Sequence, residues 1–185
     1  MKGKIFSEAE KKMEGVVNFF KKEIGTLRAG RASISLLEGI TVEYYGSKMP
    51  ISQIATITIP QPQLIVIQPW DKNMLQEITK AIQSSNIGLN PIPDANVIRV
   101  PVPPISEERR QELVKILHRM GEEAKVEIRE IRRKGNEELK KAEKDKMITE
   151  DDMHKGIEEI QEITDKFIKE IDKRIEEKSK EIMEG

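Results

Sequence analysis

The residues Val100-Pro101-Val102-Pro103-Pro104-Ile105-Ser106-Glu107-Glu108 decide how this chain is organised, because two kinds of sequence meet there. The segment before them is rich in proline and β-branched residues, whereas the chain after them contains no proline. All nine prolines fall between Pro50 and Pro104. Proline interrupts a helix because it lacks a backbone donor and clashes with the preceding turn. Long helices are therefore expected outside this segment and not within it.

Charge divides the chain at the same places. Only nine of the 73 residues from 32 to 104 are charged, against 56 of the other 112. The same segment contains Trp70, Tyr44 and Tyr45, which are all the Trp and Tyr residues present. The sequence thus predicts an α+β fold with two domains. Residues 1–30 and 105–185 form a helical domain, and residues 31–104 form a small β/α/β domain inserted into it.

Three apolar stripes at helical spacing run through the charged segments. The first contains Ala9, Met13, Val16, Phe20, Ile24 and Leu27. The second begins near Ser106 and contains Leu113, Leu117, Met120, Ala124, Ile128, Ile131 and Leu139. The third follows a predicted capping box at Thr149 and Asp152 and contains Met153, Ile157, Ile160, Thr164, Phe167, Ile171 and Ile175. Since such stripes must be buried, we expect a long antiparallel three-helix bundle. An intermolecular coiled coil is the alternative.

The inserted segment has the pattern of strands and turns. Strands are predicted at residues 40–45, 54–59, 64–67 and 97–100, which are rich in β-branched and aromatic residues. The run 64–67 is apolar throughout and is expected at the centre of a sheet. Asp71 is expected to cap a helix that carries Leu75, Ile78 and Ile82 and stops by Gly88.

The sequence argues against an enzyme and indicates no cofactor or metal. There is no cysteine, and the two histidines, His118 and His154, lie on separate predicted helices. Residues 25–32 imitate a phosphate-binding loop, but Arg31 and Ala32 replace the lysine and hydroxyl residue that such a loop requires. No apolar run is long enough for a signal peptide or a membrane span, so we expect a cytoplasmic protein with no membrane partner.

Arginine is concentrated in the second predicted helix and just before it. Seven of the ten arginines lie between Arg99 and Arg133, and Lys125, Arg129, Arg132 and Arg133 form one ridge beside the apolar stripe. Residues 99–136 have a net charge of +3, whereas residues 150–185 have a net charge of −6. Because the guanidinium fork matches paired phosphate oxygens, the ridge predicts phosphate binding. The alternative is a solvated face with local ion pairs to Glu122, Glu127 or Glu130.

Two further arginines, Arg28 and Arg31, flank Gly30 at the entry to the inserted segment. An antiparallel bundle could bring them to the same side as the arginine ridge. We therefore include them in the predicted phosphate-binding set.

Several longer motifs carry a family resemblance. They are Leu27-Arg28-Ala29-Gly30-Arg31-Ala32-Ser33, Val42-Glu43-Tyr44-Tyr45-Gly46, Ile87-Gly88-Leu89-Asn90-Pro91, Ile98-Arg99-Val100-Pro101, Pro103-Pro104, Glu107-Glu108-Arg109-Arg110, the residues Arg129, Ile131, Arg132 and Arg133, and Ile148-Thr149-Glu150-Asp151-Asp152. With these motifs the chain resembles the bacterial ribosome recycling factors over its whole length.

The resemblance implies an L-shaped, monomeric protein that binds the 70S ribosome and its large subunit. With elongation factor G and GTP, it would split post-termination ribosomes into subunits. Arg28, Arg129 and Arg132 would contact 23S rRNA, with Arg31 and Arg133 as further members of this site. The hinge between the domains would comprise Ala29-Gly30-Arg31 and Val102-Pro103-Pro104-Ile105.

A rival interpretation from another class is a helical scaffold or chaperone-like module that binds protein through an exposed seam. Such a module would bind with little dependence on salt and would tolerate changes to the arginines. An RNA-binding surface would lose affinity steeply as salt rises.

Overall fold

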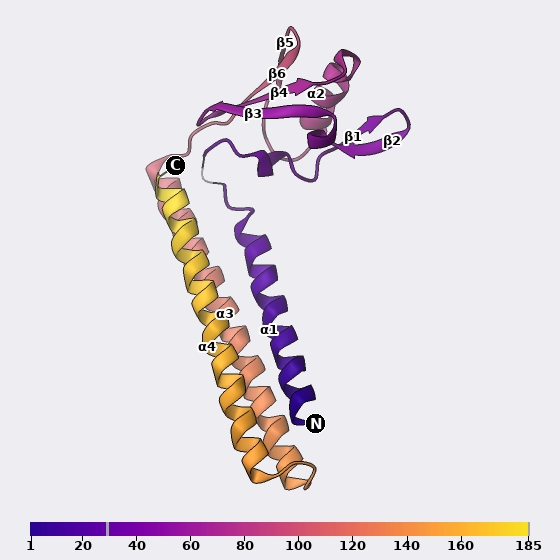
Figure 1. Ribbon diagram of the computed structural model, residues 1–185. Coiled ribbons are helices and arrows are strands. Elements are labelled where there is room, and N and C mark those ends of the chain that lie inside the picture. The colour runs from indigo at the N-terminus through magenta and orange to yellow at the C-terminus, as the bar shows by residue number, and fades with distance from the viewer. Residues whose placement is uncertain (29, 185) are drawn as a thin grey trace. The chain divides into compact units, whose positions relative to one another are not determined.

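The computed structural model describes residues 1–28 and 30–184, which form two compact units (Figure 1). The helical unit contains Met1–Arg28 and Glu107–Glu184, and the β unit contains residues 30–106. The α+β fold class expected from the sequence is confirmed. The division into domains 1–30 with 105–185 and 31–104 stays a prediction, and Ala29 and Gly185 lie outside the described residues.

Three long helices make up the helical unit (Figure 1). They are α1 at Lys2–Ile24, α3 at Glu107–Lys144 and α4 at Glu150–Glu184, and each packs against the other two. A short turn at residues 145–149 reverses the chain between α3 and α4. In the described part of the chain, no helix combines the length and apolarity needed to cross a membrane.

The predicted stripes account for most of the buried seam. All six residues of the first stripe are buried, as are Leu113, Leu117, Ala124, Ile128 and Leu139 on α3. Met120 and Ile131 are only half-buried, and the inward positions beside them are taken by Gly121 and Gly135. On α4, Met153 and Ile157 are half-buried while Gly156 is buried. Glycine lacks a hydrophobic side chain, so an apolar-periodicity search does not include it.

The start of α4 has the predicted capping box. The Asp152 amide donates to Thr149 Oγ1 at 3.0 Å, and the Thr149 amide donates to Asp152 Oδ2 at 3.3 Å. These bonds satisfy two donors that a helix start would otherwise leave unpaired. Hydrogen bonding from the Thr149 side chain and from the Thr149 amide stabilises the carboxylate and lowers the pKa of Asp152 below its usual value.

Close approach of α3 and α4 requires the glycines of the seam. A Cβ added at Gly121 would lie 2.2 Å from Cδ1 of Ile175, and one at Gly156 would lie 2.9 Å from both Cδ atoms of Leu139. Contacts this short do not occur between carbon atoms in a relaxed core. Gly121 and Gly156 therefore let the large side chain of the opposite helix pack directly on the backbone.

A matched pair of substitutions tests this packing. Alanine in place of glycine gains about 1 kcal/mol of helix propensity, so Gly15→Ala, at an exposed site on α1 with no atom within 4 Å of the added Cβ, should stabilise the helical unit. In Gly121→Ala, overpacking costs typically about 1–3 kcal/mol and should outweigh that gain. Urea unfolding followed by far-ultraviolet circular dichroism measures both. Equal stabilisation by the two variants would show that Gly121 has no packing role.

The β unit contains two sheets and one α-helix. Strands β1 at Thr41–Tyr44 and β2 at Ser47–Pro50 form an antiparallel hairpin. A four-stranded antiparallel sheet has the order β3-β4-β6-β5, with bounds Ala55–Gln61, Leu64–Pro69, Val97–Pro101 and Ile92–Asp94. Helix α2, Leu75–Ser84, packs against β1, β5 and β6. The apolar run 64–67 lies in β4 between β3 and β6, which confirms its central position.

Two strands and one turn differ from the sequence prediction. The sequence did not predict β2 or β5, because Ser47–Pro50 and Ile92–Asp94 are short, contain proline and lack alternating hydrophobicity. Both are edge strands, where proline is tolerated. Asp71 caps a 3₁₀ turn at Lys72–Met74 rather than α2 itself, since its Oδ1 accepts from the Asn73 amide at 3.0 Å.

Candidate nucleic-acid interface

The predicted arginine ridge lies on the flank of α3 that borders α4. At about 100° per residue, Arg132 falls next to the buried seam and Arg129 and Arg133 point further outward. The exposures agree with this order, because Arg132 is half-buried and the other two are exposed. The ridge residues therefore differ in environment although they are close in sequence.

Arg132 is anchored on the neighbouring helix. Its Nη1 donates to Gln161 Oε1 on α4 at 3.2 Å, and Gln161 Nε2 in turn donates to Asp165 Oδ1 at 2.9 Å. A guanidinium carries five N–H donors, so one neutral acceptor leaves most of them available. Arg132 is thus held in one orientation with its charge not neutralised by that contact.

Two other ridge residues form local ion pairs. Arg133 donates to both Glu130 and Glu137. These carboxylates raise the pKa of Arg133, and Arg133 lowers the pKa of Glu130. Lys125 pairs with Asp172 on α4 and with Glu122, its side chain is only 12% exposed, and Asp172 raises its pKa. For Arg133 and Lys125 the structure shows the ion-paired alternative considered from the sequence.

Arg129 has a different environment. It is exposed, and no hydrogen bond or ion pair of this side chain is found within residues 1–28 and 30–184. An exposed arginine without an acidic neighbour in contact can meet a phosphate without first breaking an ion pair. Arg129 and Arg132 therefore form the part of the ridge best suited to bind an anion.

The remaining two arginines of the predicted set are not on α3. Arg28 is exposed in the helical unit, and Arg31 is exposed in the β unit. Added Cβ atoms at Gly135 and Gly121 would contact Ala9 and Phe20, which fixes the antiparallel alignment of α1 with α3. Arg28 follows the end of α1 at Ile24 and lies beyond Phe20 in this alignment, toward the start of α3, whereas Arg129 is in the second half of α3. Arg28 is thus not part of the ridge on α3.

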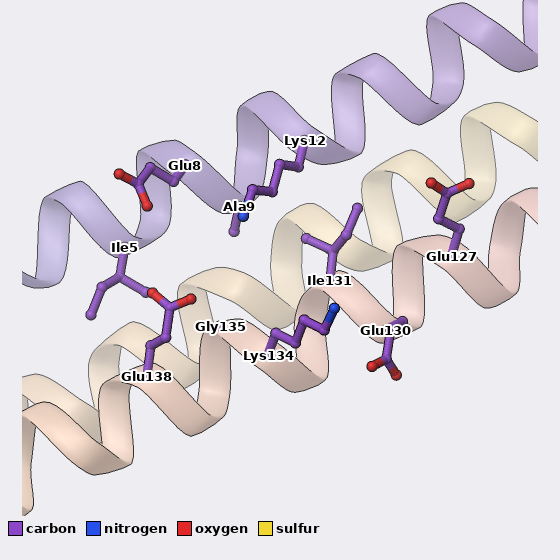
Figure 2. Close-up of a pocket in the computed structure, with 10 residues that line it drawn as sticks. All are labelled: Ile5, Glu8, Ala9, Lys12, Glu127, Glu130, Ile131, Lys134, Gly135 and Glu138. Carbon is purple, nitrogen blue, oxygen red and sulfur yellow. The ribbon is translucent and has the colours of Figure 1, made fainter.

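The opposite flank of α3 forms a groove with α1 (Figure 2). The groove has a volume of about 310 Å³. Its floor is apolar, with Ile5, Ala9 and Ile131, and its rim carries both acidic and basic groups: Glu8, Lys12, Glu127, Glu130, Lys134 and Glu138. No histidine lines it, and within the described residues no set of three or more His, Cys, Asp or Glu side chains is placed to hold a metal.

Comparison with known proteins assigns the chain. Residues 20–183 match the family model described as "Ribosome recycling factor".

The chain belongs to the ribosome recycling factor family.

Its relatives match it over nearly their whole length. It is 51% identical over 180 residues to the ribosome-recycling factor of Syntrophomonas wolfei, with 97% of each chain covered. It is 47% identical over 184 residues to that of Halalkalibacterium halodurans, with 100% of each covered. Both relatives are named ribosome-recycling factor.

Two solved structures are similar to it. A solution structure of a ribosome recycling factor is 48% identical, covers 100% of this chain and has a TM-score of 0.84. A second has a TM-score of 0.66, is 39% identical and covers 99% of each chain. The second is described as models of the T. thermophilus ribosome recycling factor and the E. coli elongation factor G bound to the E. coli post-termination complex.

The segments that connect the two units are held by the β3–β4 turn. The Ala32 amide donates to the Pro62 carbonyl at 2.7 Å, and the Val102 amide donates to the Gln63 carbonyl at 2.8 Å. Val102, part of the predicted hinge, is buried in the core of the β unit. Of the other predicted hinge residues, Pro103 and Pro104 are exposed and Ala29 lies outside the described residues.

Gly30 fits against the second connecting segment. Its φ is +74°, and an added Cβ would lie 2.9 Å from the Ile105 backbone nitrogen. Both features require glycine, because L-residues disfavour this backbone region and a backbone atom cannot easily move aside. The two connecting segments thus touch each other at Gly30 and Ile105.

Substitutions at two glycines distinguish the effect of the positive φ from the effect of the close contact with Ile105. Gly39 also has a positive φ, +84°, but no atom lies within 4 Å of an added Cβ. Gly39→Ala should cost about 1–2 kcal/mol from backbone strain alone, and Gly30→Ala should cost more because of the Ile105 contact. Thermal unfolding is followed by near-ultraviolet circular dichroism in the Trp and Tyr bands. This signal reports on the β unit, because that unit contains every Trp and Tyr residue of the chain. An equal cost for the two variants would contradict close packing at Gly30.

Proposed function

We propose that this protein binds the large subunit of the bacterial ribosome through α3 and, with elongation factor G and GTP, splits post-termination ribosomes into subunits. The observation that carries the proposal is the match, over 99% of both chains, to a ribosome recycling factor described on the post-termination complex with elongation factor G. We further propose that it acts as a monomer in the cytoplasm, where such complexes occur.

The charges of α3 support RNA as the direct contact of the helical unit. Binding RNA backbone requires cations that replace counterions along the phosphates, and arginine suits this because its fork pairs with two phosphate oxygens. Arg129 and Arg132 offer such groups on one flank of a 38-residue helix. Structured RNA can be recognised by its shape and its phosphate groups without base-specific contacts. We propose 23S rRNA as the contact of Arg28, Arg129 and Arg132, with Arg31 and Arg133 at its margin.

Acidic residues of α4 support one orientation on the RNA. Residues 150–185 have a net charge of −6, so the outward face of α4 would be repelled by phosphate. The arginine flank would be attracted at the same time. Together these two effects favour one orientation of the bundle about its long axis when it binds RNA.

We propose that the β unit is the part on which elongation factor G acts. The described residues offer no nucleotide-binding loop, so GTP hydrolysis supplies energy only through the partner. The bonds of Ala32 and Val102 hold both connecting segments to the β unit, which favours bending at the other proposed hinge residues, Ala29-Gly30-Arg31 and Pro103-Pro104-Ile105. A force on the β unit would then pass through two short segments into the bundle.

Removal of single arginines tests the RNA contact. Arg132→Ala and Arg129→Ala should each weaken binding to isolated large subunits by about 1–3 kcal/mol, the range for losing a charged hydrogen-bonded contact. Arg174→Ala is the matched control, because Arg174 is exposed on the acidic helix α4. Co-sedimentation with large subunits over a range of protein concentrations measures the affinity.

The same assay tests the rival scaffold interpretation. Binding through several phosphates should weaken steeply as salt is raised. Unchanged affinity in both arginine variants, together with little salt dependence, would favour a helical scaffold or chaperone-like module. Far-ultraviolet circular dichroism must show unchanged melting for the variants, because neither arginine is in the core.

Subunit splitting is tested with purified components. Post-termination 70S ribosomes, elongation factor G, GTP and this protein should give a fall in light scattering that requires all four. Omission of GTP is the control for the energy source. If scattering does not change while the protein still binds large subunits, the protein binds ribosomes without recycling them.

A further inference from the structure

Two residues of α4 connect Arg132 to a carboxylate without placing that carboxylate against it. Arg132 Nη1 donates to Gln161 Oε1 at 3.2 Å, and Gln161 Nε2 donates to Asp165 Oδ1 at 2.9 Å. Gln161 and Asp165 are four residues apart on one helix, a spacing at which glutamine and aspartate side chains meet. The contacts from α3 into α4 therefore pass through a neutral amide.

The carboxylate of Asp165 sets the orientation of this amide. An amide side chain has an oxygen that accepts and an NH₂ group that donates, whereas a carboxylate only accepts and a guanidinium only donates. Because its NH₂ group is bonded to Asp165, Gln161 turns its oxygen toward Arg132. The opposite orientation would bring two donors together at Arg132 and two acceptors together at Asp165. Only one arrangement satisfies all three side chains.

Helix formation does not explain a neutral residue at position 161. Glutamine and glutamate have the same length and nearly the same helix propensity. Helix α4 is rich in glutamate, and Gln161 is its only glutamine. A glutamate at this position would form an ion pair with Arg132, as Glu130 and Glu137 do with Arg133. The residue that contacts Arg132 from α4 thus holds it without neutralising its charge.

One edge of the Arg132 guanidinium remains open to a ligand. Nε and Nη2 form this edge, and within residues 1–28 and 30–184 neither atom has a hydrogen-bond partner. A phosphate that accepts from two parallel N–H groups would bind along it. Fixing a long side chain before the ligand arrives reduces the entropy that is lost on binding.

We infer that Gln161 and Asp165 are positioning residues for the RNA contact of Arg132. Asp165 orients the Gln161 amide, Gln161 fixes the direction of the guanidinium, and the neutral amide leaves the charge of Arg132 for phosphate. Asp165 therefore promotes RNA binding, although a carboxylate by itself repels phosphate. The inference rests on the proposed function, because it requires that Arg132 meets RNA.

Substitutions at Asp165 separate positioning from charge repulsion. Asp165→Ala should weaken binding to isolated large subunits even though it removes a negative charge. Asp165→Asn keeps an oxygen that can accept from Gln161, so its affinity should equal or exceed that of the parent protein. Glu158→Ala is the matched control, because Glu158 is an exposed acid three residues before Gln161 on α4 and has no bond to it.

Charge repulsion alone predicts the opposite result for Asp165→Ala. It predicts that this variant, Asp165→Asn and Glu158→Ala all bind at least as tightly as the parent protein. Parental or higher affinity of Asp165→Ala would therefore overturn the inference. An affinity of Asp165→Asn as low as that of Asp165→Ala would overturn it too, because the accepting oxygen would then not be what matters.

Substitutions at Gln161 test the neutral contact. Gln161→Ala should weaken binding by about three- to tenfold, the scale for ordering one long side chain on binding. Gln161→Glu should weaken it at least as much, because an ion pair would neutralise Arg132. A role limited to joining α3 to α4 predicts parental affinity for Gln161→Glu, since an ion pair would join the helices as firmly. Parental affinity of either variant would overturn the inference.

A double-mutant cycle shows whether Gln161 acts through Arg132. In an Arg132→Ala background, Gln161→Ala should cause no further loss of affinity. An undiminished further loss would show that Gln161 acts independently of Arg132 and would overturn the inference. Thermal melting of the variants, followed by far-ultraviolet circular dichroism, should stay close to that of the parent protein, because Gln161 and Asp165 are exposed.

The Arg132→Ala variant alone distinguishes the two possible failures. If it binds large subunits like the parent protein, the proposed RNA contact of Arg132 fails and the inference fails with it. If Arg132→Ala weakens binding while Gln161→Ala and Asp165→Ala do not, the inference fails and the proposed function stands.

Discussion

Contact between α3 and α4 at their glycines is the constraint on which the helical unit depends. Gly121 receives the Ile175 side chain and Gly156 receives Leu139, so the two longest helices approach closely enough for partners on their edges to meet. Arg132 reaches Gln161, and Lys125 reaches Asp172, only because of this approach. The arrangement of charge on the outer surface is therefore a consequence of packing in the seam.

That arrangement gives the ridge residues unequal roles. Lys125 and Arg133 already have carboxylate partners, and such surface ion pairs contribute little to stability but reduce the charge available for a ligand. Arg132 has a neutral partner that fixes its direction. Arg129 remains exposed on the same flank. The proposed phosphate-binding surface therefore depends on Arg129 and Arg132, although the sequence places four basic residues together.

The two units use different chemistry. The helical unit carries dense charge of both signs, whereas the β unit carries few charges and two exposed aromatic side chains, Tyr45 and Trp70, which are hydrogen-bonded to Asp71 and Thr56. The two connecting segments are hydrogen-bonded to Pro62 and Gln63 and touch each other at Gly30 and Ile105. They therefore lie side by side on the β unit.

The sequence by itself determined the three helices, the capping box of α4, the central strand β4 and the family, because these follow from periodicity, proline positions and ordered motifs along one chain. It missed β2, β5 and the glycine contacts, since short edge strands and glycines have no periodic signal. The partners that the ridge residues have on α4 were decided only by tertiary structure, whereas the pairs of Arg133 with Glu130 and Glu137 are local to α3. Gln161 and Asp172 are distant in sequence from Arg132 and Lys125, and such contacts depend on distance in space.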